Sequence, residues 1–296
     1  MIRTVYSGYL LCLFAVTIWG ATFTVTKQLL TTVPPMLILL VRFLVGYAAL
    51  WALAPNRLPW QGIRAEARLA LAGILGVTFY FLLENLALEH GGAGMVSVVV
   101  CTSPVLTALF SRLIGRGNPL RIGYWLGFLL AASGVLLTVS QGHLSTLKGA
   151  WQGAALAASG AVAWALYTLT PQTLREKSSK VAVTRRTFFW GILGMLPFCL
   201  LEIHRWSLAP LLMWPSIWRL LALGIVAGAL CYVAWNIAVT RLGGVRATLF
   251  LYLNPIVGVL VAAAVLHEPL TGCILLGVAL TLLGVLVSTW ATRTSH

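Results

Sequence analysis

Stretches of about twenty apolar residues follow one another along the chain, separated by short polar connections. A helix needs about 20 apolar residues to cross the hydrocarbon core of a membrane. Turn-forming residues separate the stretches, as at Pro34–Pro35 and Gly91–Gly92. Strands of a membrane barrel would be shorter and would alternate with polar positions. The pattern therefore predicts an all-α integral membrane protein with ten transmembrane helices, near residues 8–27, 34–54, 69–89, 94–114, 122–140, 150–170, 186–203, 217–239, 245–265 and 272–291.

Composition supports a membrane protein and excludes a soluble one. Of the 296 residues, 60% are hydrophobic and only 9% are charged, whereas a soluble domain carries roughly 25% charged residues. So few charges cannot cover a water-exposed surface. The first apolar stretch lacks a small-residue cleavage site, so we expect a retained helix rather than a signal peptide.

The distribution of basic residues predicts the orientation in the membrane. The net charge of +14 comes from 20 Lys and Arg against six acidic residues, all of them Glu. These basic residues lie mainly between apolar stretches, so the positive-inside rule explains them better than a nucleic-acid partner does. With a cytoplasmic N-terminus, fifteen lie on the inner side and four on the outer side, while Arg42 lies within the second stretch. We predict a multi-pass protein of the cell inner membrane with cytoplasmic N- and C-termini.

The sequence contains no pattern typical of an enzyme or a metalloprotein. The five cysteines are scattered singly, and without a CxxC pair neither a zinc site nor a disulfide framework is predicted. The histidines fall at the ends of apolar stretches or between them, and no HExxH, GxSxG or phosphate-binding loop occurs. We therefore predict a protein that is not an enzyme and has no metal or cofactor.

The two halves of the chain resemble each other. Residues 84–109 can be laid without a gap on residues 235–260, which aligns Asn85 with Asn236 and Pro104 with Pro255. The repeat divides the chain into five-helix halves at about 1–143 and 148–296. Because five is odd, the second half must enter the membrane from the opposite side. Inverted repeats are a recurring architecture of secondary transporters, which bind substrate between the repeats and open alternately to either side.

Several short motifs agree with one known family. They are the "IWG" at Trp19, the "VRF" containing Arg42, the "NP" at Pro255 and the "HEPLT" from His267 to Thr271. Together with the ten-helix layout, they resemble the EamA-type exporters of the drug/metabolite transporter superfamily over the whole chain. The first half departs from this pattern, because it has "GNPL" where the second half has "EPLT".

The resemblance implies a secondary transporter that exports amino acids or related small metabolites across the inner membrane. The aromatic amino-acid exporters are one branch of the family to which the chain could belong. Three alternatives stay open: a facilitator of the same fold, an importer of the same fold, and a proton-coupled multidrug exporter. The partners implied are a small-molecule substrate and the lipid bilayer.

Polar and aromatic residues fall on one face of several predicted helices at helical-turn spacing. Rings combined with a few hydrogen-bonding groups are typical of a small-molecule pocket. Alternatively, Ser and Thr satisfy their own backbone, and Trp and Tyr anchor helices at the membrane surface. The predicted substrate-binding residues are Trp19, Thr22, Phe81, Glu84, Asn85, Ser97, Trp164, Tyr232, Asn236 and Tyr252.

Glu84 is the only carboxyl clearly inside a predicted span. An ionised carboxylate in hydrocarbon is costly, so Glu84 should face a cavity, pair with a cation or carry a proton. A proton-binding carboxyl would suit proton coupling, but a position at the pore mouth or a pair with Arg42 is favoured. Arg42 in turn can pair with Glu84 or with a carboxylate of the substrate.

Two further patterns concern helix shape and packing. Pro104 and Pro255 are predicted at the centres of their helices, where a proline removes a backbone hydrogen bond and kinks the helix. Because the repeat duplicates the position, we interpret them as paired hinges, with static kinks as the alternative. Small residues are spaced along the fifth and tenth stretches and predict close helix packing, within the chain or in a homodimer; they are Gly127, Ala131, Gly134, Gly277 and Gly284.

Overall fold

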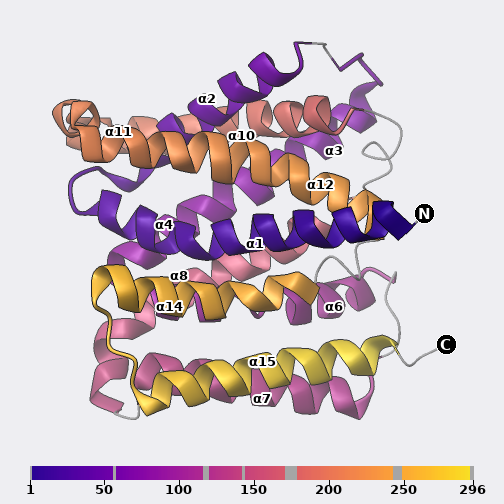
Figure 1. Ribbon diagram of the computed structural model, residues 1–296, viewed down its shortest axis with the longest axis vertical. Coiled ribbons are helices and arrows are strands. Elements are labelled where there is room, and N and C mark those ends of the chain that lie inside the picture. Colours follow the sequence, from indigo (N-terminus) through magenta and orange to yellow (C-terminus); the bar gives the residue numbers. More distant parts are fainter. Residues whose placement is uncertain are drawn as a thin grey trace.

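The computed structural model describes residues 2–55, 58–115, 120–141, 144–170, 179–242 and 249–293. Every regular element within these ranges is a helix, which confirms the all-α fold class. The helices lie side by side in one bundle, and α1 begins at the end of the bundle where α15 finishes (Figure 1). The side of the membrane that this end faces stays a prediction.

The first half of the chain forms the following elements, where η marks a π or 3₁₀ segment. They are α1 (Ile2–Leu30), α2 (Pro35–Leu53), α3 (Ile63–Gly73), η1 (Ile74–Phe79), α4 (Tyr80–His90), α5 (Ala93–Val100), α6 (Ser103–Leu113) and α7 (Ile122–Ser140). The second half forms α8 (Leu144–Leu169), α10 (Lys180–Glu202), η2 (Ile203–Arg205), η3 (Ala209–Leu212), α11 (Trp214–Leu221), η4 (Ala222–Leu230), α12 (Cys231–Leu242), η5 (Leu249–Leu253), α14 (Asn254–Leu266) and α15 (Gly272–Arg293).

Six helices in the described part of the chain are long and apolar enough to cross a membrane. They are Tyr6–Leu30, Pro35–Leu53, Ile63–His90, Ala93–Leu113, Ile122–Ser140 and Trp214–Leu242. Two shorter helices, Phe250–Leu266 and Gly272–Ser288, are also apolar. The chain is thus a multi-helix membrane protein, while the number of ten spans and the inversion of the halves stay predictions.

Local sequence explains where several helices begin and end. Pro35 occupies the first turn of α2, where its missing N–H costs no hydrogen bond. The helices α7 and α14 end at Gln141 and His267, whose φ angles of 49° and 56° lie in the left-handed region. A left-handed residue at this position stops a helix by turning the chain away from its axis.

Two long helical rods contain π-helical segments that hydropathy does not reveal. η1 lies between α3 and α4, and η4 lies between α11 and α12. In the repeat alignment the two segments fall at overlapping positions, each directly before α4 or α12. A π segment shifts the side chains that follow it and is frequent at functional sites.

Glycines bring α7 and α15 into close contact. A Cβ at Gly134 would lie 2.4 Å from the backbone nitrogen of Thr281, and a Cβ at Gly284 would lie 2.2 Å from that of Ala131. Real Cβ atoms do not approach backbone so closely, so the contact requires glycine. Close packing by these residues is confirmed, and it occurs within the chain.

Glycines also let helices of the two halves pack closely against each other. A Cβ at Gly46 of α2 would lie 2.9 Å from the carbonyl oxygen of Gly224 in η4. A Cβ at Gly73 of α3 would lie 2.7 Å from the backbone nitrogen of Gly191 in α10. These two crossings fix how near α2 comes to η4 and how near α3 comes to α10.

We predict that Gly284→Ala destabilises the protein, because the added methyl group has no room against Ala131. Overpacking of this kind costs about 1–3 kcal/mol. Gly272→Ala is the matched control, since a Cβ there meets nothing within 4 Å. The measurement is the thermal unfolding midpoint in detergent. Equal midpoints for the two variants would contradict the packing role of Gly284.

Candidate functional site

A pocket lies between helices of the two halves. Small-molecule sites typically combine apolar walls with a few polar groups. The pocket is lined by Trp19, Thr22, Phe23, Arg42, Tyr80, Phe81, Glu84, Val100, Cys101, Ser103, Pro104, Trp164, Tyr232, Leu251 and Asn254. Residues from α1, α2, α4, α6, α8, α12 and α14 thus meet in one place.

Six of the ten predicted substrate-binding residues line this pocket. They are Trp19, Thr22, Phe81, Glu84, Trp164 and Tyr232, and the predicted hinge residue Pro104 lies beside them. The two halves contribute through equivalent residues, since Trp164 is the repeat counterpart of Trp19 and Tyr232 that of Phe81. The repeat therefore identified two pairs of equivalent residues in the pocket wall.

Four predicted residues do not line the pocket, because each contacts a neighbouring helix or its own. The side-chain amide of Asn85 donates to the carbonyl oxygen of Pro35 at 3.1 Å, and that of Asn236 donates to Thr184 at 2.8 Å. Ser97 donates to the carbonyl oxygen of Gly94 at 2.7 Å. Tyr252 packs in a separate apolar cluster with Cys101, Val105 and Tyr124.

The aromatic rings of the pocket pack against one another in edge-to-face or tilted arrangements. Trp19 lies 6.2 Å from Trp164 and 5.5 Å from Tyr232, between ring centroids. Its indole N–H donates to the carbonyl oxygen of Ala227 in η4 at 3.0 Å. Tyr80 lies 4.9 Å from Trp164. These ring contacts and the hydrogen bond of the Trp19 indole stabilise the arrangement of the side chains in this wall.

Two oppositely charged residues lie within the aromatic wall. Arg42 is 1% exposed and Glu84 is 2% exposed. The Arg42 guanidinium lies 4.3 Å from the centroid of the Phe81 ring, and Tyr80 forms a side-chain hydrogen bond with Glu84. Within the described residues, Nε and Nη1 of Arg42 and Oε1 of Glu84 have no hydrogen-bond partner. Polar atoms buried without partners cost free energy, so these atoms are available to a polar group bound in the pocket.

Several pocket residues are not among the ligands predicted from the sequence, chiefly Tyr80, Phe23, Ser103 and Asn254. Tyr80 precedes Glu84 by four residues and Phe23 follows Trp19 by four, so helical spacing points to both. Asn254 directly precedes Pro255, and its side-chain oxygen has no hydrogen-bond partner within the described residues. Ser103 carries no signal that distinguishes it from a packing residue.

The two prolines interrupt the α-helical hydrogen bonding, as expected of a proline within a helix. Pro104 and Pro255 each lie in the first turn of a new α-helix, α6 or α14, while the residue before that helix, Thr102 or Leu253, keeps right-handed helical backbone angles. Each proline lacks the N–H that would continue the helical hydrogen bonds. The carbonyl of Val100, four residues before Pro104, accepts a hydrogen bond from the Ser103 hydroxyl at 2.5 Å. Both helices are therefore interrupted at equivalent points beside the pocket.

Charged residues brace the end of the bundle opposite the termini, where α14 connects to α15 (Figure 1). Glu268 accepts hydrogen bonds from the backbone N–H groups of Ala93, at 2.8 Å, and Gly94, at 3.1 Å. Lys27 donates to the carbonyl oxygens of Leu88 and Gly91. The anion and the cation thus hold the start of α5 and the end of α4, and Glu268 ties them to the second half.

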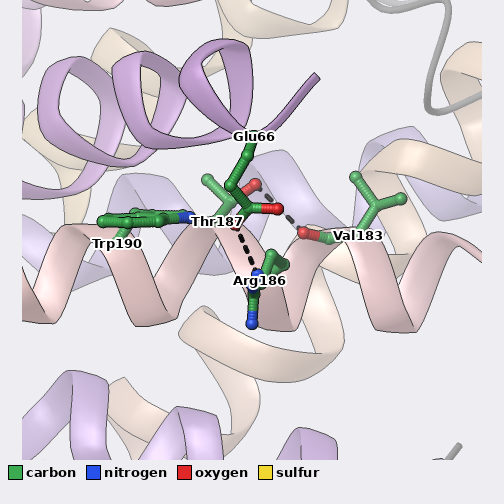
Figure 2. Close-up of polar contacts among 5 residues, drawn as sticks. All are labelled: Glu66, Val183, Arg186, Thr187 and Trp190. Carbon is green, nitrogen blue, oxygen red and sulfur yellow. Dashed lines mark hydrogen bonds and ion pairs between the residues drawn. The ribbon is translucent and has the colours of Figure 1, made fainter. Parts of the chain in front are cut away.

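A second bridge lies between α3 and α10, near the end where α1 begins. Figure 2 shows the Glu66 carboxylate against Arg186 and Trp190 of α10. Arg186 Nε lies 2.6 Å from Glu66 Oε1, and the Trp190 indole N–H donates to the same oxygen. Glu66 belongs to the first half and its partners to the second, so this bridge also joins the halves.

Comparison with known proteins places the chain among transporters. It is 26% identical to an "uncharacterized transporter" of Archaeoglobus fulgidus, over 95% of this chain and 96% of that protein. It is 27% identical to a "probable amino-acid metabolite efflux pump" of Salmonella typhimurium, over 96% and 95%. A "probable terminal-alkyne amino-acid exporter" of Streptantibioticus cattleyicolor is 28% identical, over 74% and 71%.

The fold and the family agree with these relatives. A solved crystal structure superposes with a TM-score of 0.65 at 21% identity, over 98% of this chain and 99% of that one, which shows a shared fold. The model of the EamA-like transporter family matches residues 6–140 and again residues 151–290. The chain therefore belongs to the EamA-like transporter family of the drug/metabolite transporter superfamily and contains two EamA repeats.

Proposed function

We propose that the protein is a secondary transporter that exports amino acids, including aromatic ones, or related small metabolites across the inner membrane. The observation that carries the proposal is the aromatic pocket with unpartnered charged atoms on Arg42 and Glu84. A family of transporters and relatives named as amino-acid exporters support it. The substrate site in this proposal is the pocket between the two halves, and both termini are cytoplasmic.

Contacts between equivalent residues support two repeats related by a two-fold axis, while ten spans and the inversion of the repeats rest on hydropathy and on the odd number of spans in each repeat. Halves related by a two-fold axis place residues near that axis against their own counterparts. Trp19 contacts Trp164, and Phe43 contacts Phe188 at 5.0 Å; both pairs are separated by 145 residues. Away from the axis, contacts should occur in exchanged pairs. Gly134 meets Thr281 while Gly284 meets Ala131, as an offset of 150 residues requires.

The bridges at the two ends suit alternating access. The Glu66–Arg186 pair joins the halves near the end where α1 begins, and Glu268 joins them to α5 at the other end. Opening the pocket at one end must separate one bridge while the other persists. The interruptions at Pro104 and Pro255 supply points at which α5–α6 and η5–α14 can bend.

A proton-coupled multidrug exporter stays an alternative, because Arg42 and Glu84 give the pocket one charge of each sign. A facilitator or importer of the same metabolites would use the same pocket. Only a measurement of flux direction under a defined gradient separates these from an exporter.

The test of this function is flux in proteoliposomes loaded with a panel of amino acids, with and without a pH gradient. We expect transport of amino acids, with aromatic ones among the substrates, because six of the fifteen residues that line the pocket are aromatic. Transport that follows the imposed pH gradient would show proton coupling. If no amino acid moves while an unrelated solute does, the proposed substrate class is wrong.

We expect Trp19→Ala and Tyr232→Ala to lower this flux about tenfold at unchanged membrane abundance, since loss of one substrate contact worth about 1.4 kcal/mol has that effect. Trp151→Ala is the matched control, because Trp151 is 57% exposed and lies outside the pocket. The measurement is initial rate divided by the amount of reconstituted protein. A parallel loss of abundance and rate would show a packing role.

The prolines should bias the two access states in opposite directions. Alanine restores an N–H at the interruption, which favours a continuous helix and so one access state. Pro104→Ala and Pro255→Ala, being related by inversion, should favour opposite states, measured by cysteine accessibility from each side of the membrane. Pro197→Ala, within α10 and away from the pocket, is the control. An unchanged accessibility ratio in both variants would leave the prolines as static features.

A further inference from the structure

We propose that Arg42 and Glu84 together recognise both charges of a zwitterionic α-amino acid, Arg42 binding the carboxylate and Glu84 the ammonium group. The inference rests on the proposed transport function and adds the residues that select the substrate. It requires a substrate whose ammonium and carboxylate groups are attached to the same carbon atom and whose side chain is apolar or aromatic.

Arg42 is arranged to bind a carboxylate. Its guanidinium packs over the Phe81 ring at 4.3 Å, so the ring occupies the face of the guanidinium and leaves its N–H edge available. Nε and Nη1 have no hydrogen-bond partner within the described residues, although the side chain is only 1% exposed. A guanidinium donates strong, charge-assisted hydrogen bonds to a carboxylate, and Nε or Nη1 of Arg42 can supply one.

Glu84 supplies the opposite charge nearby. It lies close enough to Arg42 for electrostatic attraction, yet its Oε1 has no hydrogen-bond partner within the described residues. Tyr80, which bonds to Glu84, orients the carboxylate from the preceding turn of α4. An ammonium group brings N–H donors to this oxygen. The zwitterion has no net charge, and neither does the pair of Arg42 and Glu84. Binding therefore gives each charged group a partner of opposite charge without adding net charge to the membrane interior.

The remaining walls indicate the side chain of the substrate. Trp19, Trp164 and Tyr232 lie around the same pocket and offer ring edges and faces instead of further charges. Aromatic pairs favour such edge-to-face contacts. An apolar or aromatic side chain fits this wall, whereas a charged side chain would be left without a partner among these rings.

The experiment measures competition against counterflow of labelled L-phenylalanine by the wild-type protein in proteoliposomes. The competitors are L-phenylalanine, 3-phenylpropionate, which lacks the ammonium group, and phenethylamine, which lacks the carboxylate. Each analogue leaves one buried charge without a partner, and we expect each to compete at least about 100-fold less well. If L-phenylalanine is carried but the analogues compete equally well, this inference is wrong and the transport function stands. If no amino acid is carried, the transport function itself fails.

Two variants that remove one charge each test the two roles separately. Glu84→Gln should lower the preference for L-phenylalanine over 3-phenylpropionate at least tenfold while the preference over phenethylamine persists. Arg42→Gln should have the mirror effect, and Arg42→Lys keeps the charge if the glutamine variant fails to fold. Glu66→Gln is the matched control, because Glu66 bonds to Arg186 away from the pocket, and its selectivity ratios should equal those of the wild type.

Two results would overturn the assignment. One is an equal loss of competition by all three compounds in both pocket variants, with the protein present in the membrane at normal abundance. That result shows a structural role for the two residues. The other is a Glu84→Gln protein that keeps wild-type selectivity in counterflow but no longer responds to a pH gradient, which makes Glu84 a proton carrier instead of a substrate ligand.

Discussion

The structure depends on one constraint: inside a bilayer every polar group must find its partner within the protein. The backbone meets it by forming helices, and the interruption before Pro104 meets it locally, because Ser103 bonds to the carbonyl of Val100. Several buried polar atoms of the described chain have no hydrogen-bond partner, and among them those of Arg42 and Glu84 belong to charged side chains that are almost fully buried. A membrane protein can keep such atoms only where a cavity or ligand receives them, which is why they identify the site.

Glycine contacts determine where those charges lie. The crossings of Gly46 with Gly224 and of Gly73 with Gly191 let α2 and α10 approach η4 and α3. At that approach Phe43 stacks between Phe81 and Phe188, with ring centroids 5.0 Å from each. The stack fixes the Phe81 ring on which the Arg42 guanidinium rests. A widened crossing would therefore displace the charged group as well as the rings.

Hydropathy and the repeat predict the fold and much of the pocket, because both follow from residue type and spacing. The repeat identified Trp19 with Trp164, and the structure brings them together. The π segments could not be predicted, since a shift from one backbone hydrogen-bond pattern to another leaves hydropathy unchanged. Asn85 and Asn236 were assigned to the pocket because spacing gives a helix face but not the neighbour that the face meets. Both instead donate to an adjacent helix, in equivalent ways.

The repeat duplicates the framework but not the chemistry. Glycine contacts, helix interruptions and several rings occur in both halves, and these are the features that the proposed exchange of states needs twice. The charged pair occurs once. Aligning Phe43 with Phe188 places Thr187 opposite Arg42, and the repeat places Trp235 opposite Glu84. Thr187 bonds to its own helix at Val183, and Trp235 packs on Trp19 at 5.4 Å. A symmetric framework with one asymmetric pair can move between two equivalent states while it holds the substrate in a single orientation.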